Sequence, residues 1–446
     1  MRIFNRTSKI FVTSLVTLSV LLGGCGKDDP QPGPGAATPI PMDFIGVFPI
    51  NLDTTQTPAL SLMISGNAGV SGTIDIPGLS YSATFTTDAS GEAVLLLPAG
   101  ALLNLLDTVQ NLGVLIHAED TVSVLAVNDV YSSTSVYSIP PETALDTTYY
   151  LLGYGAGPIQ GSFLAVAGVV DATTLTITPA MASGTHAAGT AYTVNLNRGE
   201  TYQIQADTTT GDLTGTLVQA TNPVSVFTGH SAGNVPAGSS YAGQMITPQP
   251  PTSATGTDFY LAPFSTRSGY WVRIVATQPN TTLSYDGFGG VYGATSLANA
   301  GQFTFFRETL PGRITSDKPI VLAQYAESGM VDIVTTADPC MTVVPPTSQF
   351  ANAYSFATPA STSFANGYAN LIVPNSATGT LTYNGTPLSA GIFSVIGTSG
   401  YSQATLNLQA GSNRLSSSGA NFGVIVYGWG AATVYNGVCF APGIGY

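Results

Sequence analysis

An internal repeat limits what this chain can fold into more than any other feature of its sequence. Two blocks of sequence each occur four times, with a period of about 100 residues. The first block, a hydrophobic run, a turn and a Thr-rich run, occupies residues 61–76, 163–177, 272–285 and 370–383. The second block occupies residues 113–128, 215–230, 312–326 and 413–428. Because two separate blocks share one period, we interpret the chain as about four copies of one folding unit.

The pattern inside each copy predicts β-strands. Val122 and Val124 alternate with other residues, and this period of two places one side-chain face inward. Asn384-Gly385 follows a strand-like run and favours a tight hairpin. Pro223 and Pro319 are expected just before their strands, where a missing amide donor does no harm. Seven or eight short strands in roughly 100 residues are typical of a β-sandwich, so the predicted fold is all-β, with tandem β-sandwich modules.

The repeat also predicts how the chain is divided. The expected modules span residues 43–130, 131–236, 237–338 and 339–446, with Pro-rich linkers at 138–141, 247–251 and 344–346. One segment departs from the strand pattern, because the leucines of Ala99–Gln110 predict a short helix. Propeller blades run about 40 to 50 residues, so a period twice as long favours separate sandwiches in a row over a closed propeller-like ring.

Composition excludes several classes of protein. Charged residues make up 8% of the chain, against roughly 25% in an ordinary soluble domain. The chain has 11 Lys and Arg against 24 Asp and Glu, and its net charge is −13. Nucleic-acid binding needs clustered cations, so nucleic acid is not an expected partner. A hydrophobic content of 44% is too high for a disordered chain.

The N-terminus predicts export and lipidation. Residues 1–24 combine three early cations with the apolar run Ile10–Leu22, which is shorter than the ~20 residues that a membrane-spanning helix needs. The run leads into Leu22-Gly23-Gly24-Cys25, which resembles the lipobox of bacterial lipoproteins and implies cleavage before a lipidated Cys25. The alternative is an ordinary signal peptide with an incidental cysteine.

Residues 25–42 are interpreted as the lipidated cysteine and a Pro/Gly-rich linker that lifts the folded part off the membrane. The segment that follows Cys25, Gly26-Lys27-Asp28-Asp29, resembles the short lysine-plus-acid signal that sends Bacteroidetes lipoproteins to the outer face of the outer membrane. We therefore expect a protein that is lipid-anchored in the outer membrane and exposed at the cell surface.

A longer pattern in the second copy resembles a named family. Its segments include DLTGT (212–216) and NPVSVFTGH (222–230), and the residues that carry the pattern are Asp212, Thr214, Gly215, Pro223, Gly229 and His230. Over about residues 120–435 the chain resembles the IgG Fc-binding protein N-terminal domain family. The resemblance implies a secreted adhesive or binding module, without implying that this chain binds antibody. The family often has cysteines after the histidine, where this chain has Ser231-Ala232-Gly233-Asn234; this departure puts any function of a disulfide-bonded loop in doubt.

The cysteines beyond Cys25 are an even pair. Because Cys340 and Cys439 belong to an exported chain, we predict that they form a disulfide. Closing a loop of about 100 residues contributes up to about 4.7 kcal/mol in the chain-entropy model. The alternative is two buried thiols. No Cys-x-x-Cys motif or nearby histidine indicates a metal site, and no metal or cofactor is predicted. A calcium ion held by loop oxygens stays open as an alternative, without ligands that the sequence names.

No catalytic constellation is recognised in the sequence. His117 and His230 are interpreted as strand-edge residues, and His186 lies in a Gly/Ala/Thr loop. There is no Gly-x-Ser-x-Gly elbow. The acidic residues that could serve a glycosidase occur in turn contexts, where carboxylates cap the backbone: Asp207, Asp212, Asp317 and Asp338. Core packing is favoured over a sugar-binding platform for the aromatic residues Tyr270, Trp271 and Trp429.

Together these features predict a non-enzymatic, cell-surface lipoprotein that acts in adhesion or ligand binding. The expected partners are the membrane, through the lipid anchor, and a host glycoprotein, a glycan or an envelope protein. Two alternatives stay open. One is a structural subunit of a cell-envelope assembly, and the other is a carbohydrate-active enzyme.

Overall fold

The computed structural model describes residues 39–51, 57–130, 133–289, 292–334, 336–359, 361, 364–431, 434 and 436–443. The predicted signal (1–24), Cys25 and most of the predicted linker lie outside the described residues. The described part belongs to one compact unit, Pro39–Tyr446. It consists of β-strands joined by turns and 3-10 helices, so the all-β prediction is confirmed. No helix among the described residues is long and apolar enough to cross a membrane.

Two four-stranded sheets at the start of this unit share one core. The first sheet has the order β1 (Met42–Gly46), β6 (Val114–Ala118), β3 (Ser71–Ile76), β4 (Tyr81–Thr86). The second has the order β5 (Glu92–Leu97), β2 (Ala59–Gly66), β7 (Val122–Val130), β8 (Ser133–Ile139). Ile45, Ile74 and Ile116 of the first sheet are buried in the same cluster as Leu62 and Val124 of the second. The sheets pack face to face, and we call them the first sandwich.

The next two strand sets have the same pairing order, except that one long strand passes through both sheets. In the second sandwich the halves are β12 (Tyr192–Leu196), β11 (Thr173–Thr178), β14 (Leu217–Gly233), β9 (Asp146–Tyr150) and β13 (Thr201–Gln205), β10 (Ser162–Gly168), β14, β15 (Gly243–Pro248). In the third they are β19 (Thr295–Leu297), β18 (Thr281–Asp286), β21 (Gly312–Ala326), β16 (Gly256–Leu261) and β20 (Phe303–Glu308), β17 (Tyr270–Ala276), β21, β22 (Met341–Val343).

The fourth sandwich again has two separate sheets. They are β23 (Ala353–Thr358), β29 (Gly411–Ser417), β25 (Leu381–Tyr383), β26 (Thr386–Pro387) and β27 (Ser394–Val395), β28 (Tyr401–Asn407), β24 (Asn366–Pro374), β30 (Gly423–Trp429), β31 (Gly437–Phe440). The module boundaries stay a prediction, since Pro39–Tyr446 is one compact unit. Strand pairing favours slightly later boundaries, because β8, β15 and β22 pair with the strands that precede them.

The two prolines expected just before strands lie inside the long ones. Pro223 is within β14 and Pro319 is within β21. The β14 ladder to β11 ends at Ala220 and the ladder to β10 begins at Val224, so the proline sits where the strand changes sheets and no partner needs its missing amide. The proline is therefore placed where the strand crosses between the sheets, because no ladder hydrogen bond is needed from its position.

The helix predicted over Ala99–Gln110 is wrong. Only Ala99–Ala101 forms a 3-10 turn. The rest of the segment pairs with the second sandwich: Asp107 N donates to Gln203 O (2.8 Å), and Gln110 and Thr201 exchange backbone hydrogen bonds. Backbone pairing with the edge strand β13 therefore overrides the local helix preference of the leucines.

Three Pro-Pro linkers connect the sandwiches at the predicted places. Each ends in a short 3-10 helix whose N-cap is the second proline: η3 (Glu142–Ala144) after Pro141, η4 (Thr252–Ala254) after Pro251 and η6 (Thr347–Gln349) after Pro346. The proline ring fixes φ near −65°, so each linker leaves its strand in the same direction.

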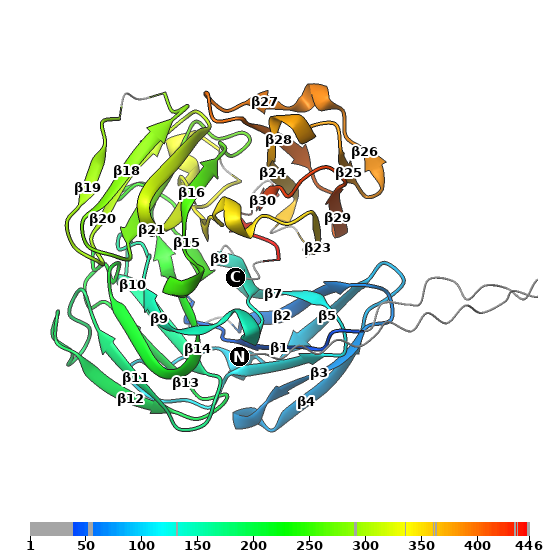
Figure 1. Ribbon diagram of the computed structural model, residues 1–446. Coiled ribbons are helices and arrows are strands. Elements are labelled where there is room, and N and C mark those ends of the chain that lie inside the picture. The colour runs from blue at the N-terminus through cyan, green and yellow to red at the C-terminus, as the bar shows by residue number, and fades with distance from the viewer. Residues whose placement is uncertain are drawn as a thin grey trace, which may run out of the picture. The chain divides into compact units, whose positions relative to one another are not determined.

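The last strands of the four sandwiches meet at the centre of this unit (Figure 1). β8 contacts β15 and β31, and β22 contacts the same two strands, so the contacts form a closed cycle. Side chains bond across it, since Ser135 Oγ donates to Gln244 O (2.8 Å) and Thr247 Oγ1 accepts from Val343 N (3.2 Å). The sandwiches therefore close into a ring in place of the expected row, because the ring buries four strand edges that a row would expose.

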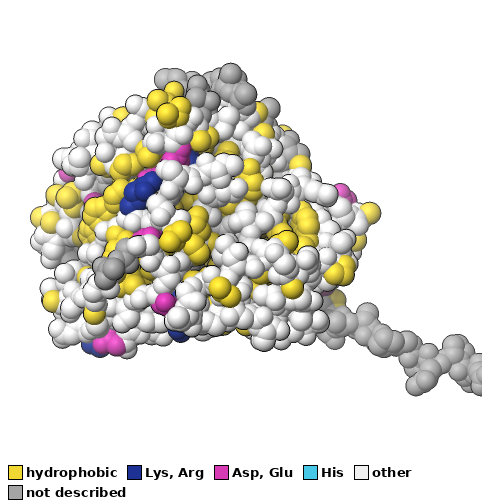
Figure 2. Space-filling view, turned by 90° about the horizontal axis from the view of Figure 1, so that it is seen from above, with side chains coloured by type: hydrophobic (Ala, Val, Ile, Leu, Met, Phe, Trp, Pro, Cys, Tyr) yellow, Lys and Arg dark blue, Asp and Glu magenta, His cyan; other side chains and the backbone are white. Residues whose placement is uncertain are grey.

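The outer surface carries few charges. In Figure 2 most of the visible face is uncharged polar side chains and backbone, with small apolar patches and isolated charged groups. This agrees with the 8% of charged residues in the sequence. Because charged side chains are few, the contacts of each one help to show where a functional site lies.

Candidate functional site

Neighbouring sandwiches touch at glycines, and one of the junctions is looser than the others. A Cβ atom on Gly113 would lie 2.6 Å from Gly199 O, and one on Gly215 would lie 2.4 Å from Gly301 O. These distances mean that the backbones of successive sandwiches meet directly. At the junction of the fourth and first sandwiches, a Cβ on Gly411 would meet only the side chain of Glu92, at 3.4 Å. The ring is therefore more open at this seam.

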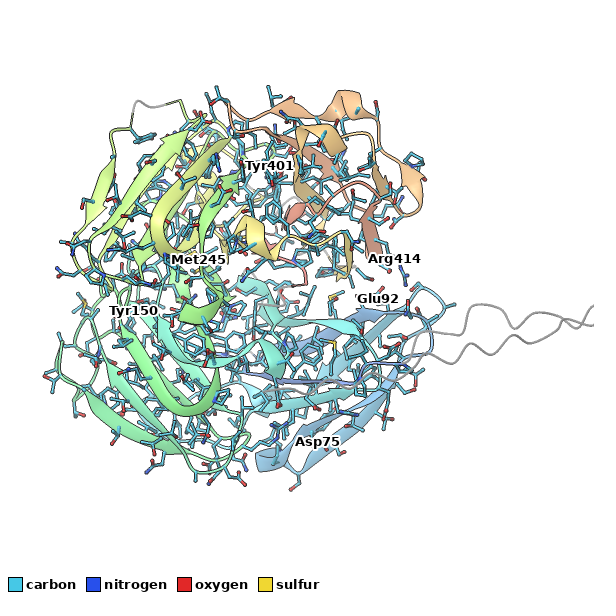
Figure 3. All side chains as sticks on the ribbon, in the orientation of Figure 1. Asp75, Glu92, Tyr150, Met245, Tyr401 and Arg414 are labelled. Atoms are coloured by element: carbon cyan, nitrogen blue, oxygen red, sulfur yellow. The ribbon has the colours of Figure 1, made fainter. Side chains whose placement is uncertain are left out.

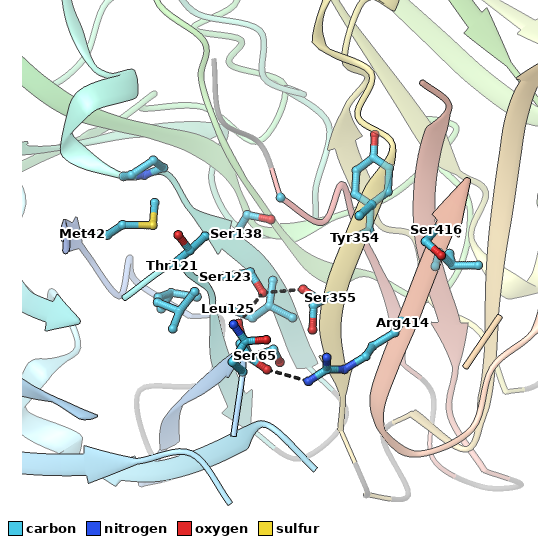
Figure 4. A pocket seen from close by; sticks show the side chains of 18 of the residues that line it. Met42, Ser65, Thr121, Ser123, Leu125, Ser138, Tyr354, Ser355, Arg414 and Ser416 are labelled. Atoms are coloured by element: carbon cyan, nitrogen blue, oxygen red, sulfur yellow. Dashed lines mark hydrogen bonds between the residues drawn. The ribbon is translucent and has the colours of Figure 1, made fainter. Parts of the chain in front are cut away.

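A cleft of about 630 Å³ lies at this seam (Figure 4). A second cavity, beside Pro250 and Val343, has a volume of only about 10 Å³. A volume of this size suits a small molecule or a short segment of polymer. The residues that line it are Met42, Phe44, Ser65, Gly66, Asn67, Thr121, Val122, Ser123, Val124, Leu125, Ser138, Ile139, Pro141, Ala353, Tyr354, Ser355, Thr382, Gly385, Arg414, Leu415, Ser416 and Gly443.

Two hydrogen bonds cross the cleft and join its walls. Ser123 Oγ of β7 donates to Ser355 O of β23 (2.7 Å), and Arg414 Nη2 of β29 donates to Gly66 O at the end of β2 (2.7 Å). Ser65 and Ser355 also line the cleft, and their Oγ atoms are buried without a hydrogen-bond partner. A buried hydroxyl without a partner costs free energy, so both atoms are suited to bond a ligand.

Arg414 gives the cleft its charge. None of the lining residues is acidic, and Arg414 is the cation among them. Five other arginines in the described ranges each form an ion pair with a carboxylate: Arg198, Arg267, Arg273, Arg307 and Arg313. No such pair involves Arg414 among the described residues, and its one side-chain bond, to Gly66 O, leaves further N–H donors of the guanidinium open.

Glu92 lies near Arg414 without neutralising it (Figure 3). An ion pair with a guanidinium would lower the pKa of a carboxyl group. The pKa of Glu92 is instead raised, first by burial and then by the charge of Asp88. Arg414 therefore keeps its positive charge available to the cleft.

The sequence analysis missed this cleft, because its lining residues extend from Met42 to Gly443 along the chain. One signal was present in the sequence. Between residues 339 and 446, Arg414 is the single charged residue. A single charged residue in so long an uncharged stretch indicates a position where the charge has a functional role, such as binding a ligand.

Three of the predicted family residues form a clamp between the second and third sandwiches. Arg273 Nη1 donates to Asp212 Oδ2 (2.5 Å) and to Thr214 Oγ1 (3.0 Å). Its guanidinium also lies 4.9 Å from the centre of the Phe303 ring. Gly215 follows with φ +91° and touches Gly301. The motif at 212–215 therefore holds two sandwiches together.

The other three family residues lie in β14. Pro223 marks the sheet crossing, and Gly229 has no room for a side chain, since a Cβ would lie 1.7 Å from Met245 O. His230 is fully buried between β10 and β15, which corrects its interpretation as a strand-edge residue. His230 is buried because β15 pairs with β14 on the side that was expected to be a free edge. Burial lowers the pKa of His230 to about 4.

The other histidines make polar contacts near the surface. His117 Nδ1 and Asp43 Oδ1 are 2.8 Å apart, and this hydrogen bond raises the pKa of His117. His186 Nε2 and Asp107 Oδ1 are also 2.8 Å apart, and this contact joins the first and second sandwiches. Partial burial raises the pKa of Asp107, but hydrogen bonds from His186 and Tyr202 outweigh it and lower the pKa overall.

Cys340 and Cys439 are both buried and are free thiols in this structure. Burial, followed by a hydrogen bond that the Cys439 thiol donates to Cys340, raises the pKa of Cys439 well above its ordinary value. The two side chains therefore lie in contact, and their disulfide stays a prediction. Cys25 lies outside the described residues.

Most groups considered for an enzyme or a sugar platform have structural partners, but Asp338 does not fit its interpretation as a turn-capping carboxylate: it is buried, its Oδ1 has no hydrogen-bond partner, and burial raises its pKa to about 8. Asp207 and Asp317 each accept a backbone N–H, as expected for turn-capping carboxylates. Tyr270 and Trp429 are buried in the core, as favoured from the sequence. No group of three or more His, Cys, Asp or Glu side chains that could hold a metal ion is found in the described ranges.

Comparison with known proteins identifies the family. The model of the family described as IgGFc binding protein matches residues 133–428, which is more than half of the chain. This chain belongs to the IgGFc-binding protein family. The predicted resemblance is confirmed, and the matched region extends from β8 of the first sandwich into β30 of the fourth.

One curated relative in this family is the human IgGFc-binding protein. It is 27% identical over 249 residues, which cover 54% of this chain and 4% of the human protein. The chain thus corresponds to a small part of that relative. A solved structure of a Ca²⁺-stabilised adhesin with which an Antarctic bacterium binds ice covers 90% of this chain and 98% of its own at 13% identity, but with a TM-score of 0.12 it carries no argument.

We predict that Asp212→Ala loosens the clamp of this IgGFc-binding family member. The substitution leaves the buried Arg273 charge without its carboxylate, which costs about 3 to 5 kcal/mol of unfolding free energy. Urea unfolding measures the effect. Asp171→Ala is the control, because its exposed carboxylate only accepts the Arg198 amide. In the double variant with Arg273→Met the two costs should be far from additive; an additive result would contradict the clamp.

We predict that acid destabilises the protein through His230. Its folded pKa of about 4 lies below the unfolded value of ~6.5, so its contribution is intact above pH 6.5 and is lost as the pH falls toward 4. From pH 7 to pH 5 the contribution of His230 falls by about 2 kcal/mol, measured by urea unfolding as the difference between the native protein and His230→Asn at both values. The asparagine amide oxygen can replace Nδ1 as acceptor for Ala232 N. This difference isolates His230, because the raised pKa values of His117 and of Asp338 (about 8) give those groups the opposite pH dependence; equal changes in the native protein and His230→Asn would refute the assignment.

Proposed function

We propose that this protein is a non-enzymatic binding protein, anchored in the outer membrane through lipid on Cys25 and displayed at the cell surface in adhesion. It captures its ligand in the cleft between the first and fourth sandwiches. The partner is a host glycoprotein, a glycan or an envelope protein. The observation that carries this proposal is the cleft itself, which combines unpartnered buried hydroxyls with an unpaired cation.

Family membership supports a binding role. The family is named for binding, and the human relative's name refers to the Fc part of immunoglobulin G. Immunoglobulin G Fc is therefore one of the first proteins to offer to the cleft, together with host glycoproteins and glycans. The shape of the cleft adds support, since deep, largely apolar clefts with a few polar groups are the usual form of ligand sites.

We predict that Thr382→Trp blocks binding. Thr382 lies at the mouth of the cleft, and its hydroxyl bonds only that of Ser416 (2.8 Å), so an indole fits there without disturbing the core. Ser284→Trp is the matched control, because Ser284 pairs with Thr315 of β21 as Thr382 pairs with Ser416 of β29, but far from the cleft.

Binding is measured by retention on arrays of glycoproteins, glycans and immunoglobulin G Fc. Thr382→Trp should lose at least about tenfold in affinity for whatever the native protein retains, while Ser284→Trp keeps it. Equal retention by both variants, or no binding by the native protein to any class, would sink the proposal.

The cellular address rests on Cys25. We predict that Cys25→Ser releases the protein from the membrane fraction, because the acyl chains provide the hydrophobic attachment. Fractionation and surface proteolysis of intact cells measure this; a Cys25→Ser protein that stays membrane-bound would contradict lipid anchoring.

In the same oxidising environment Cys340 and Cys439 form a disulfide, which peptide mapping without reductant would detect as a linked pair.

A structural role in an envelope assembly is the second candidate. β5 is an edge strand, and Val94 and Leu96 on it are 57% and 76% exposed. An exposed apolar edge is suited to pairing with a strand of a neighbouring protein. Cross-linking in the native membrane distinguishes this candidate, since a stable protein partner at β5 would favour it over ligand capture in the cleft.

A further inference from the structure

We propose that the cleft at the seam binds a short apolar peptide segment that ends in a carboxylate, and that Arg414 binds this carboxylate. This inference rests on the proposed function and names its ligand. It starts from the isolation of Arg414, the single charged residue between 339 and 446. The net charge of the chain is −13, and the other described arginines each form an ion pair with a carboxylate. Arg414 forms no such pair among the described residues.

The position of Arg414 favours a bound carboxylate. Its Nη2 donates to Gly66 O, which fixes the guanidinium at one end of the cleft and leaves other N–H donors free. A planar guanidinium with adjacent free donors matches the two oxygens of a carboxylate. The nearby carboxyl group of Glu92 has a raised pKa and no ion pair with Arg414 among the described residues. The guanidinium of Arg414 therefore gives the cleft a positive charge that can bind an anion.

The walls favour an apolar peptide over a sugar. Met42 and Pro141, which are partly exposed, give the cleft apolar surface that a ligand can contact. Sugar rings stack on exposed aromatic faces, but the aromatic residues here are 1% exposed (Phe44) and 8% exposed (Tyr354), and Tyr354 is held by its hydroxyl bond to Phe422 O. Apolar side chains of a peptide are the better match to this surface.

The floor supplies bonds for a peptide backbone. Ser65 Oγ and Ser355 Oγ come from opposite walls of the cleft and lack hydrogen-bond partners. A hydroxyl can donate to a carbonyl or accept from an amide, and an extended peptide presents both groups along its length. The two hydroxyls and the guanidinium therefore form a polar track, with apolar pockets beside it.

Two peptide pools test the proposal on the full-length protein. Both contain N-acetylated tetrapeptides of Val, Ile, Leu and Phe; one pool has free C-terminal carboxylates and the other is amidated. Binding is measured by affinity mass spectrometry at low and high salt. The native protein should prefer the acid pool by at least about tenfold, the size of one charge-assisted hydrogen bond, and salt should weaken this preference.

Variants separate charge from structure. Arg414→Gln should abolish the preference for the acid pool, and Arg414→Lys should keep part of it, since it retains the charge without the fork. Lys318→Gln removes an equal charge from a site where the ammonium only bonds the Pro279 and Asn280 carbonyls, and should change nothing. If Arg414→Gln only opens the seam, both pools change together, and that result overturns the proposal.

Other outcomes also overturn it. Equal binding of both pools by the native protein, or binding of neither, would refute the peptide carboxylate. So would Arg414-dependent binding of acidic oligosaccharides in place of the peptides. If Thr382→Trp blocks a ligand that is indifferent to Arg414→Gln, the ligand-binding function stands while this inference fails.

Discussion

The rest of this structure depends on the packing of four short strands at its centre. β8, β15, β22 and β31 contact one another in a cycle, and their exposed edges are satisfied by one another's side chains. Such a closed cycle fixes four junctions, of which three are bridged by Pro-Pro linkers. The fourth joins the first and last sandwiches without a covalent connection. It is restrained only by packing and by hydrogen bonds such as Arg414 to Gly66, and this is where the cleft opens.

Local features of the fold could be predicted from the sequence, and long-range ones could not. Asn384 and Gly385 have φ values of +48° and +79°, as the expected hairpin requires. Each Pro-Pro pair of the predicted linkers precedes a 3-10 helix, although the predicted linkers 138–141 and 247–251 begin inside β8 and β15. The ring was missed because its contacts join distant polar residues, such as Ser138 Oγ and Ala441 O (2.6 Å). Serine and glutamine on a strand look like a solvent face, and no local pattern shows that another strand covers them.

The family pattern and the candidate site turned out to be different parts of the molecule. Arg273 joins the second and third sandwiches through Asp212 and Thr214, and Gly215 lets the two backbones meet at Gly301. These residues identify the fold and could be read from the sequence. The cleft could not, because its walls come from both ends of the chain. Its one sequence signal, the isolation of Arg414, becomes visible only when charges are mapped along the chain rather than counted.

The low charge content explains how such a cleft can select an anion. A protein of net charge −13 repels carboxylates at long range, and salt at physiological strength screens that field beyond about 8 Å. Selection must therefore occur at contact, where the exposed guanidinium of Arg414 can form charge-assisted hydrogen bonds. None of the residues that line the cleft is acidic, and Glu92 near it forms no ion pair with Arg414 among the described residues. Because few other charges surround Arg414, this one guanidinium is enough to select a ligand that carries a carboxylate.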